Sequence, residues 1–375
     1  MSVNLDRPII TYETSAFFQS SSPSYDLASN SGENLSFVPF VQGVDFSFDV
    51  PMDSVASIGT KSFINRSNTI SPDINFSIKT LENFEHLFSN LFVSGAIKDD
   101  LDDDTNFYAV IGDKKGFDVS NRSLSGIDVL GFGNCFLKNV QISQSINGLM
   151  TSNYSFTASN IQAQKLEQNG NFFSGDCPAI NLTGDQKQET KVLFNEIDDY
   201  YTGESSGIIP SYSTNILISG SDSVGSFLVK TETVQNFNLN LEIQRKPIYS
   251  IGKKYPLTRK SVFPSENLFT FSSKVSDFEV NEERSNLKNF LNLNDNYTLN
   301  ISGQNKSGEV FDYVIKNAKL ASKNNAISIE GDFETTLNFK FEINEFKRKN
   351  HFLKLADGGF LLQQNFSKLI TKRNA

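Results

Sequence analysis

The sequence contains the same pattern twice, which constrains its fold more than any other feature. Residues Val41–Val50 match Val234–Ile243 without a gap, at an offset of 193 from position 41 to position 234. The match continues from Ser57–Lys61 to Ser250–Lys254, with roughly 8 identities over about 36 positions where chance gives about 2. Because Ser-Ile-Gly-x-Lys is shared at an unchanged offset, strand alternation alone does not explain the match. The sequence therefore predicts two copies of one domain.

A second block of similarity lies further along each copy. Residues Cys135–Ile142 match Tyr313–Leu320, now at an offset of 178 from position 135 to position 313. The first copy is thus expected to carry 15 more residues than the second between its blocks (offset 193 against 178), including the acidic run Asp99–Asp104. Insertions of this kind belong in loops. The duplication covers about 36–164 and 225–344.

The repeat and the composition between its copies predict the domain organisation. We expect an N-terminal arm at 1–33, a first domain at 34–164, a connector or insertion at 165–224, a second domain at 225–346 and a basic C-terminal arm at 347–375.

Each copy opens with a strictly alternating segment, in which apolar residues such as Leu239 and Leu241 are separated by Asn or Glu. Alternation with a period of two is typical of a strand in an antiparallel sheet with one buried and one polar face. Apolar residues at three- and four-residue steps follow, and they predict one short packed helix per copy. They are Leu81, Phe84, Phe88 and Leu91 in the first copy, and Leu287, Phe290 and Leu291 in the second. The predicted fold is mainly β, with two tandem antiparallel β-sandwich or partial-barrel units.

Composition excludes several classes of protein. The 34 Phe residues provide a large apolar core, while the net charge of −9 disfavours a basic nucleic-acid reader. No apolar run approaches the ~20 residues that cross a bilayer, and Met1–Thr14 shows no secretory signal. Two cysteines, Cys135 and Cys177, do not frame a disulfide scaffold, and two buried free thiols are favoured over one bridge. We expect a soluble protein made in a cytoplasm.

No pattern of catalytic residues is present. Of the two histidines, His86 lies among Phe and Leu and His351 follows a basic run; no nucleophile elbow, phosphate loop or zinc motif accompanies them. The run Asp99–Asp104 could hold Ca²⁺, but it lacks the turn glycine and distal glutamate of an EF-hand loop, so a solvated acidic loop is favoured. We expect no enzyme activity, no cofactor, and no catalytic or metal residue.

A tandem duplication without active-site residues suggests a geometrical role. Two similar domains in one chain can occupy quasi-equivalent positions in a ring, which halves the number of subunits required. Strands with one polar face, placed edge to edge, could then close into a continuous barrel with no unpaired edge.

The second copy resembles the tail tube proteins, or major tail proteins, of long-tailed bacteriophages. The resemblance rests on the alternating strand that begins with Val-Gln, on Pro247–Lys254, and on Pro264 before a Phe-rich strand. It is clearest over Thr233–Val275 and fainter over Val41–Leu81, about a fifth of the chain. In that family a β-sandwich with a flanking helix forms six-unit rings, and the rings stack into a tube that conducts DNA. Members with two units per chain form trimeric, pseudo-hexameric rings.

The resemblance implies a structural virion protein of the phage tail, assembled in the host cytoplasm. Its expected partners are further copies of itself, other tail proteins, and double-stranded DNA as a transient cargo bound without sequence specificity, with no membrane partner. Two alternatives stay open: another tail ring component, such as a terminator or a baseplate hub, and a glycan-binding or hydrolytic β-sandwich.

A DNA conduit should not grip its cargo, so a lumen of acidic and neutral polar side chains would repel phosphate. The polar face of each opening strand provides such candidates: Asp45, Ser47 and Asp49 in one copy, and Asn238, Asn240 and Glu242 in the other. An ordinary solvent-facing or subunit-facing strand is the equally weighted alternative. The loops 54–68 and 247–261 are predicted to reach the next ring rather than fold on their own domain. Their basic residues are the candidate ring contacts: Lys61, Arg66, Lys254 and Arg259.

Overall fold

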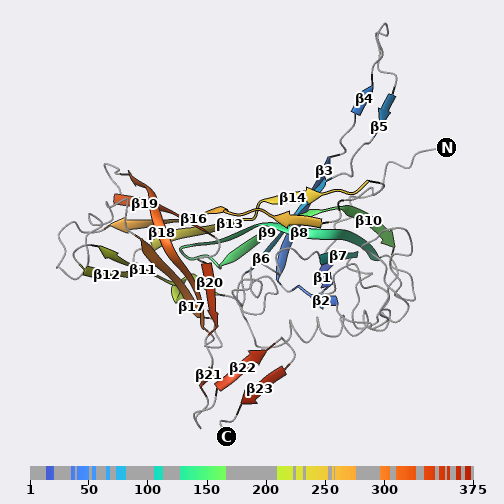
Figure 1. The fold of residues 1–375 in the computed structure, drawn as a ribbon. Helices are drawn as coiled ribbons and strands as arrows, with labels where there is room; N and C mark the ends of the chain where they lie inside the picture. The colour runs from blue at the N-terminus through green and yellow to red at the C-terminus, as the bar shows by residue number, and fades with distance from the viewer. Residues whose placement is uncertain are drawn as a thin grey trace, which may run out of the picture.

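A computed structural model shows a chain built mainly of antiparallel β-strands, which confirms the predicted class (Figure 1). The structure describes residues 14–20, 35–38, 40–49, 53–55, 65–67, 73–81, 105–112, 127–165, 209–222, 225–230, 234–251, 256, 258–275, 296–304, 310–326, 333–342, 346–350, 353–354, 360–364 and 368–372. The predicted helices lie outside these residues, apart from Leu81, which is the last residue of a strand. Within the described residues, no helix is long and apolar enough to span a membrane.

Within the described residues, the strands fall into two series of ten and a short terminal group. The first series is β1 (Thr14–Ser20), β2 (Leu35–Phe37), β3 (Val41–Asp49), β4 (Asp53–Val55), β5 (Asn65–Ser67), β6 (Asp73–Leu81), β7 (Thr105–Gly112), β8 (Ile127–Ser145), β9 (Thr151–Ala158) and β10 (Asn160–Lys165). The second series is β11 (Asn215–Asp222), β12 (Gly225–Lys230), β13 (Val234–Glu242), β14 (Arg245–Ile248), β15 (Thr258–Ser261), β16 (Glu266–Val275), β17 (Tyr297–Gln304), β18 (Val310–Ala326), β19 (Phe333–Glu342) and β20 (Phe346–Asn350). The last group is β21 (Leu353–Lys354), β22 (Phe360–Gln364) and β23 (Lys368–Lys372), and a single 3-10 turn, η1 (Ser211–Ser213), precedes β11.

Eight strands form one continuous antiparallel sheet, which we call the central sheet. Its order is β3-β6-β9-β8-β13-β16-β19-β18, so the two series meet where β8 pairs with β13. A second layer lies below each half in Figure 1. The first half of β8 pairs there with β7 and β10, and the first half of β18 pairs in the same way with β17 and β20. Strands β1 and β2 extend one second layer, and β11 and β12 extend the other.

The two series pair in the same way, strand for strand. We call β1–β10 unit 1 and β11–β20 unit 2. Phe46 lies opposite Phe76 in unit 1, and Leu239 lies opposite Phe269 in unit 2, each 193 residues later. The register of β3 on β6 also shifts just after Val41, and that of β13 on β16 shifts just after Val234. Equal registers and equal bulges are the geometry that the sequence repeat predicts for these strands.

Further along, the registers correct the sequence alignment. Cys135 lies opposite Thr105, and its counterpart opposite Tyr297 is Ala318, at an offset of 183. The sequence match had instead paired Cys135 with Tyr313, at an offset of 178. The pairings in the central sheet give the same offset of 183 residues. Leu137 lies opposite Phe156 in unit 1, and their counterparts Leu320 and Phe339 lie opposite each other in unit 2. The excess in unit 1 is therefore ten residues (offset 193 against 183), not fifteen.

Irregularities in β8 and β18 let these strands serve both layers. β8 has 19 residues and β18 has 17, far longer than the ~5–6 of an ordinary strand. Each shows two register shifts, one against the second-layer strand and one against the central-sheet strand. A bulge bends a strand and increases its twist. Each long strand therefore leaves one layer and enters the other.

Aromatic side chains fill the space between the layers. In unit 1 the Phe76 ring stacks on Phe132, with ring centroids 4.4 Å apart, and on Phe156 at 5.1 Å. In unit 2, Phe269 occupies the position of Phe76 and is also fully buried. Burial of ~150–250 Å² per aromatic side chain makes these clusters the main apolar contribution to each core.

Strands also occur in segments expected to be arms or a connector. β1, within residues 1–33, pairs with β7, and β11, within 165–224, pairs with β17. β20 lies across the expected boundary at 346 and pairs with β18. The domain boundaries stay a prediction, and these pairings show where each unit gains its outer strands.

Candidate functional site

The six residues predicted to line a lumen lie on two strands of the central sheet. Asp45, Ser47 and Asp49 belong to β3, and Asn238, Asn240 and Glu242 belong to β13. Asp45, Ser47 and Glu242 are exposed, while Asn238 and Asn240 are partly buried. The lining role itself stays a prediction.

The strand registers place these residues on one face. Asp45 lies opposite Ser77, and Ser77 lies opposite Ser155 on the next strand. Ser155 lies opposite Asn139, which lies opposite Glu242. Residues directly opposite each other in an antiparallel pair project to the same side of the sheet. A single row of polar residues therefore crosses five strands and joins the two predicted sets.

Neutral polar side chains on this face bond to one another between strands. Asn139 donates from Nδ2 to Oδ1 of Asn240 at 2.7 Å. Thr270 donates to Oδ1 of Asn338, which in turn donates from Nδ2 to Oγ of Ser322, each at 2.7 Å. Amide and hydroxyl groups that satisfy one another present little net charge, so they give neither phosphate nor cations a strong attachment point.

Charged side chains also lie on this face, and two of them form an ion pair. Lys340 lies 2.7 Å from Glu266 across neighbouring strands, and both side chains are exposed. The hydrogen bond from Lys340, reinforced by its charge, lowers the pKa of Glu266. On the opposite face of the sheet, where Lys323 of β18 lies across from the buried Leu337, burial lowers the pKa of Lys323.

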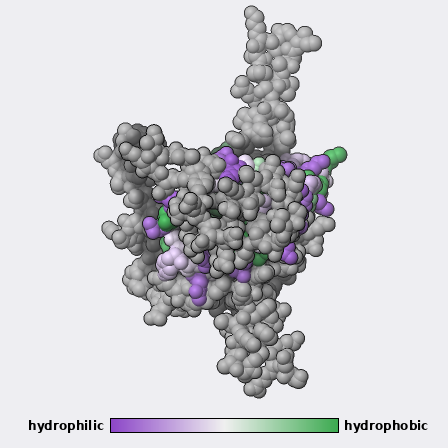
Figure 2. Space-filling model, turned by 90° about the vertical axis from the view of Figure 1, so that its left-hand side faces the viewer, coloured by the Kyte–Doolittle hydropathy of each residue, from purple (hydrophilic) through white to green (hydrophobic). Residues whose placement is uncertain are grey.

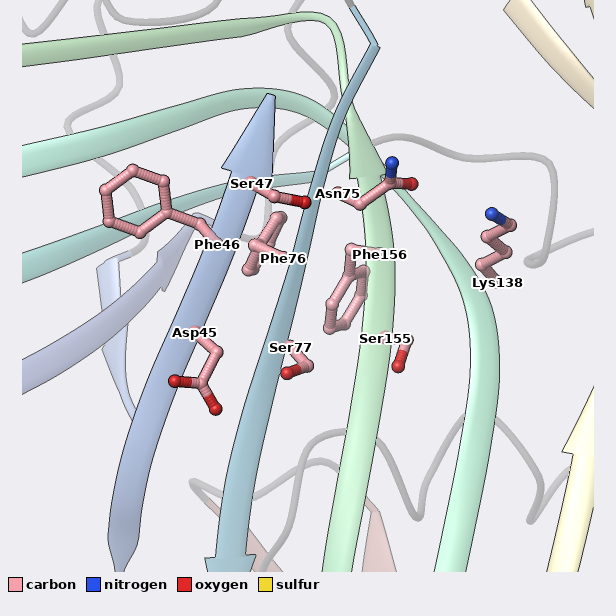
Figure 3. A pocket seen from close by; sticks show the side chains of 9 residues that line it. All are labelled: Asp45, Phe46, Ser47, Asn75, Phe76, Ser77, Lys138, Ser155 and Phe156. Atoms are coloured by element: carbon pink, nitrogen blue, oxygen red, sulfur yellow. The ribbon is translucent and has the colours of Figure 1, made fainter. Parts of the chain in front are cut away.

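A groove of about 410 Å³ crosses the unit 1 part of the sheet (Figure 3). Asp45, Ser77 and Ser155 project into it from three neighbouring strands, and Lys138 lies at its far side. The residues that line it are Asp45, Phe46, Ser47, Asn75, Phe76, Ser77, Lys138, Ser155 and Phe156. Hydroxyl and amide groups with one carboxylate and one ammonium provide no nucleophile with an adjacent base. Among the described residues, no three His, Cys, Asp or Glu side chains gather as a metal site would require.

The thiol of Cys135 is buried and donates to the carbonyl oxygen of Phe132 at 3.2 Å. Cys177, His86, His351 and the Asp99–Asp104 run lie outside the described residues.

Two hairpins, β4–β5 and β14–β15, contain the two predicted ring contacts that the structure describes, Arg66 and Arg259. Lys61 and Lys254 lie outside the described residues, and Arg66 is the middle residue of β5. Arg259 lies in β15 and is 3% exposed. It lies opposite Pro247 within the hairpin, and its role as a ring contact stays a prediction.

The two hairpins are placed differently. In Figure 1 the β4–β5 hairpin stands away from the sheet, whereas β14 lies along it above β8. Arg245, which begins β14, holds the second hairpin there. It donates from Nε to the Leu137 carbonyl oxygen at 2.6 Å and from Nη1 to the Arg259 carbonyl oxygen at 2.8 Å. Its guanidinium also lies over the Phe136 ring, 5.3 Å from the centroid. Sequence patterns could not predict this contact, because Leu137 and Phe136 belong to the other unit.

Both ends of the central sheet are edges. Among the strands that the structure describes, β3 pairs only with β6, and residues 319–326 of β18 pair only with β19. Phe46 and Phe48, expected on the buried face of β3, are 47% and 57% exposed. Their counterparts in β13, Leu239 and Leu241, are both 0% exposed. The difference has a physical cause: β13 has strands on both sides, and β3 has one.

The described surface at the unit 2 end, the face shown in Figure 2, is mainly hydrophilic with scattered hydrophobic side chains. This is the end of the sheet at which β18 lies in Figure 1. An exposed strand edge that carries polar and charged residues resists unselective pairing.

Fold and surface together define a mainly β protein of two sandwich units that share one sheet with a polar face. No family model matches the sequence, and no curated protein matches it.

Solved structures show a partial likeness. A chain of the six-fold baseplate of the anti-feeding prophage has 8% sequence identity and a TM-score of 0.27, with 37% of this chain and 93% of that chain covered. A chain of the sheath–tube complex of an extracellular contractile injection system has 13% identity and a TM-score of 0.26, with 41% and 97% covered. The tube-terminating cap of the anti-feeding prophage has 14% identity and a TM-score of 0.24, with 38% and 91% covered.

Proposed function

We propose that this chain is a structural subunit of a phage tail tube, in which three copies form a pseudo-hexameric ring and the rings stack into a conduit for DNA. The observation that carries the proposal is the continuous pairing of β8 with β13, because it shows one unit extending the sheet of another. Two units so joined, with an edge strand at each end, are the repeating piece from which a closed ring is made.

The dimensions of such a ring suit a conduit. Three copies of the eight-stranded central sheet would supply about 24 strands. At ~4.8 Å between neighbouring strands, an untilted barrel would have a circumference of about 115 Å and a diameter of about 37 Å between strand axes. Strand tilt of ~35–45° widens it further. Side chains that extend ~5 Å inward leave a lumen wide enough for a DNA duplex.

The polar face is suited to line that lumen. Several of its neutral amides and hydroxyls bond to each other, although Oδ1 of Asn238 has no partner, and its exposed carboxylates, such as Asp45 and Glu242, would repel phosphate. Tight DNA binding requires Lys and Arg side chains that displace counterions from the backbone. On this face the exposed Lys79, Lys319 and Lys340 alternate with carboxylates such as Asp45, Glu242 and Glu266, which offset their charge. Asp45, Ser47, Asp49, Asn238, Asn240 and Glu242 are therefore the proposed lining, so DNA would pass as cargo without specific contacts.

The test is the assembly state of the purified full-length chain. Sedimentation velocity and negative-stain micrographs over a range of protein concentrations should show rings of three copies and then stacked tubes. Rings that never stack would favour the alternative role of a terminator or a baseplate hub. A monomer at every concentration and salt level would refute the proposal.

A further inference from the structure

We infer that β3 of one copy pairs antiparallel with residues 322–326 of β18 in a second copy, and that this head-to-tail joint reproduces the β13–β8 joint inside the chain. The inference rests on the proposed ring, and it identifies the partner and the register of the ring contact.

The internal joint provides the template. β13 opens unit 2, and it pairs with the second half of β8, the part that lies in the central sheet of unit 1. The counterpart of β13 is β3, and the counterpart of that part of β8 is the second half of β18. These two counterparts are the edge strands of the central sheet. The β18 edge of a second copy therefore offers β3 the same strand arrangement that β8 offers β13 within the chain.

The register follows from the internal joint by moving each strand to its counterpart. Asn240 lies opposite Gln141 in the chain. Asn240 corresponds to Ser47 at the offset of 193, and Gln141 corresponds to Asn324 at the offset of 183. Ser47 of one copy thus lies opposite Asn324 of the next. By the same rule, Asp45 lies opposite Ala326 and Asp49 opposite Ser322.

The exposure of β3 supports a missing strand at this edge. Phe46 still contacts the core on its inner side, where its ring meets Phe132 edge-on with centroids 5.7 Å apart. Its outer side is open, and Phe48 is more exposed still. The corresponding Leu239 and Leu241 are closed over by the internal joint. Adding β18 from a second copy would cover both rings, with Asn325 opposite Phe46 and Lys323 opposite Phe48, where the internal joint has Ile142 and Val140.

The hairpins agree with this arrangement. In unit 2 the β14–β15 hairpin reaches across the internal joint and bonds to Leu137 of unit 1. The β4–β5 hairpin of unit 1 stands away from its own sheet in Figure 1. Across the proposed joint, that hairpin would meet the Leu320 region of the next copy, which is the counterpart of Leu137.

Paired cysteines test the register. Opposed residues in an antiparallel pair have Cβ atoms ~4.5–5.5 Å apart, close enough for a disulfide after small adjustments, whereas diagonal neighbours are ~7–8 Å apart. The full chain with Cys177→Ser would carry Ser47→Cys together with Asn324→Cys. Mild oxidation should give covalent dimers and trimers on a denaturing gel. The matched internal pair, Asn240→Cys with Gln141→Cys, should close within one chain and leave a monomer band.

Control variants separate the possible outcomes. Ser47→Cys with Ser322→Cys is two residues out of register, and it should give at least tenfold less crosslinked product. Crosslinking of Ser47→Cys alone would indicate a symmetrical β3–β3 contact and overturn the inference.

The assembly state read on the same samples separates this inference from the proposed function. Rings in micrographs without the Ser47–Asn324 crosslink would overturn the register and leave the ring proposal standing. No rings and no crosslink, with the internal pair closing normally, would overturn both.

Discussion

Replacing Phe48 by Ala is expected to weaken assembly more than it weakens the fold of a single copy. Phe48 is 57% exposed in the isolated chain, so less than half of its surface contributes to the core of its own unit. The proposed joint covers the rest. Leu241 is the counterpart of Phe48 and is 0% exposed without any partner, which makes Leu241→Ala the matched control.

The magnitude follows from the exposed area. A Phe side chain presents about 200 Å², so 57% exposure leaves roughly 110 Å² to be covered on assembly. At ~25 cal/mol per Å², covering it contributes about 2–3 kcal/mol per joint. Losing that contribution should weaken each joint by about 30- to 150-fold. Within one copy, Phe48→Ala should cost only about 1–2 kcal/mol, against the ~2–5 kcal/mol expected for a buried Leu→Ala change.

Two measurements separate the effects. Urea unfolding at a concentration where the protein is dissociated gives the free energy of unfolding of a single copy, and sedimentation velocity gives the midpoint concentration of assembly. Phe48→Ala should raise the protein concentration at the assembly midpoint strongly and lower the urea concentration at the unfolding midpoint only slightly. Leu241→Ala should lower the unfolding midpoint strongly and change the assembly midpoint less. Equal assembly midpoints for Phe48→Ala and the unchanged protein would refute the reasoning.

Two further changes test the local structure. Gly148→Ala should destabilise the turn between β8 and β9 by about 1–2 kcal/mol, because an added Cβ would lie 2.8 Å from Oγ and 3.1 Å from the carbonyl oxygen of Ser145. Gly43→Ala is the control, since a Cβ there meets nothing within 4 Å; equal losses in urea unfolding would contradict the assignment. The third prediction concerns pH: because the pKa of Glu266 is lowered, its ion pair stabilises the fold above the ordinary value of 4.5 and loses that effect as the pH falls through the lowered pKa. Replacing Lys340 by Met should return the Glu266 pKa, read by NMR titration, to its ordinary value, while an unchanged titration would show that the pair does not form in solution.

Much of the fold could be predicted because strand alternation and the repeat both survive in the sequence. The alternating segments that begin at Val41 and Val234 became β3 and β13, with equal bounds and equal bulges. β1 and β11 were not predicted as counterparts, because their sequences share no pattern and only the pairing with β7 and β17 reveals the relation.

The error in the second block has a specific cause. The Lys-Asn pair at Lys138 lies where β8 shifts register against β9, whereas the Lys-Asn pair at Lys316 lies where β18 shifts register against β17. Each long strand has both kinds of bulge, and the sequence match superposed two different ones. Residue identity therefore favoured an alignment five residues away from the structural one (offset 178 against 183).

The candidate surface could be predicted from the sequence only in part, for a similar reason. Alternation identifies the polar face of each strand, so Asp45 and Glu242 could be selected one strand at a time. It contains no information on which strand lies beside which. The row that joins Asp45 to Glu242, the Arg245 contact between units, and the exposure of Phe48 all depend on neighbours brought together by the fold.

Duplication changes the demands on the two kinds of joint in the proposed ring. The β8–β13 joint lies within the chain, so its partners are held at high effective concentration and it can close around aliphatic residues such as Leu239 during folding. The β3–β18 joint must form between separate copies, with a loss of translational and rotational freedom at each association. Each separate copy must also stay soluble before it assembles. The β18 edge carries Ser322 and Asn324, and the β3 edge carries Asp45 beside Phe46. The polar groups discourage unselective pairing, and burial of the Phe ring stabilises the correct register. The internal joint is therefore expected to withstand dilution, and the joint between copies should respond to concentration.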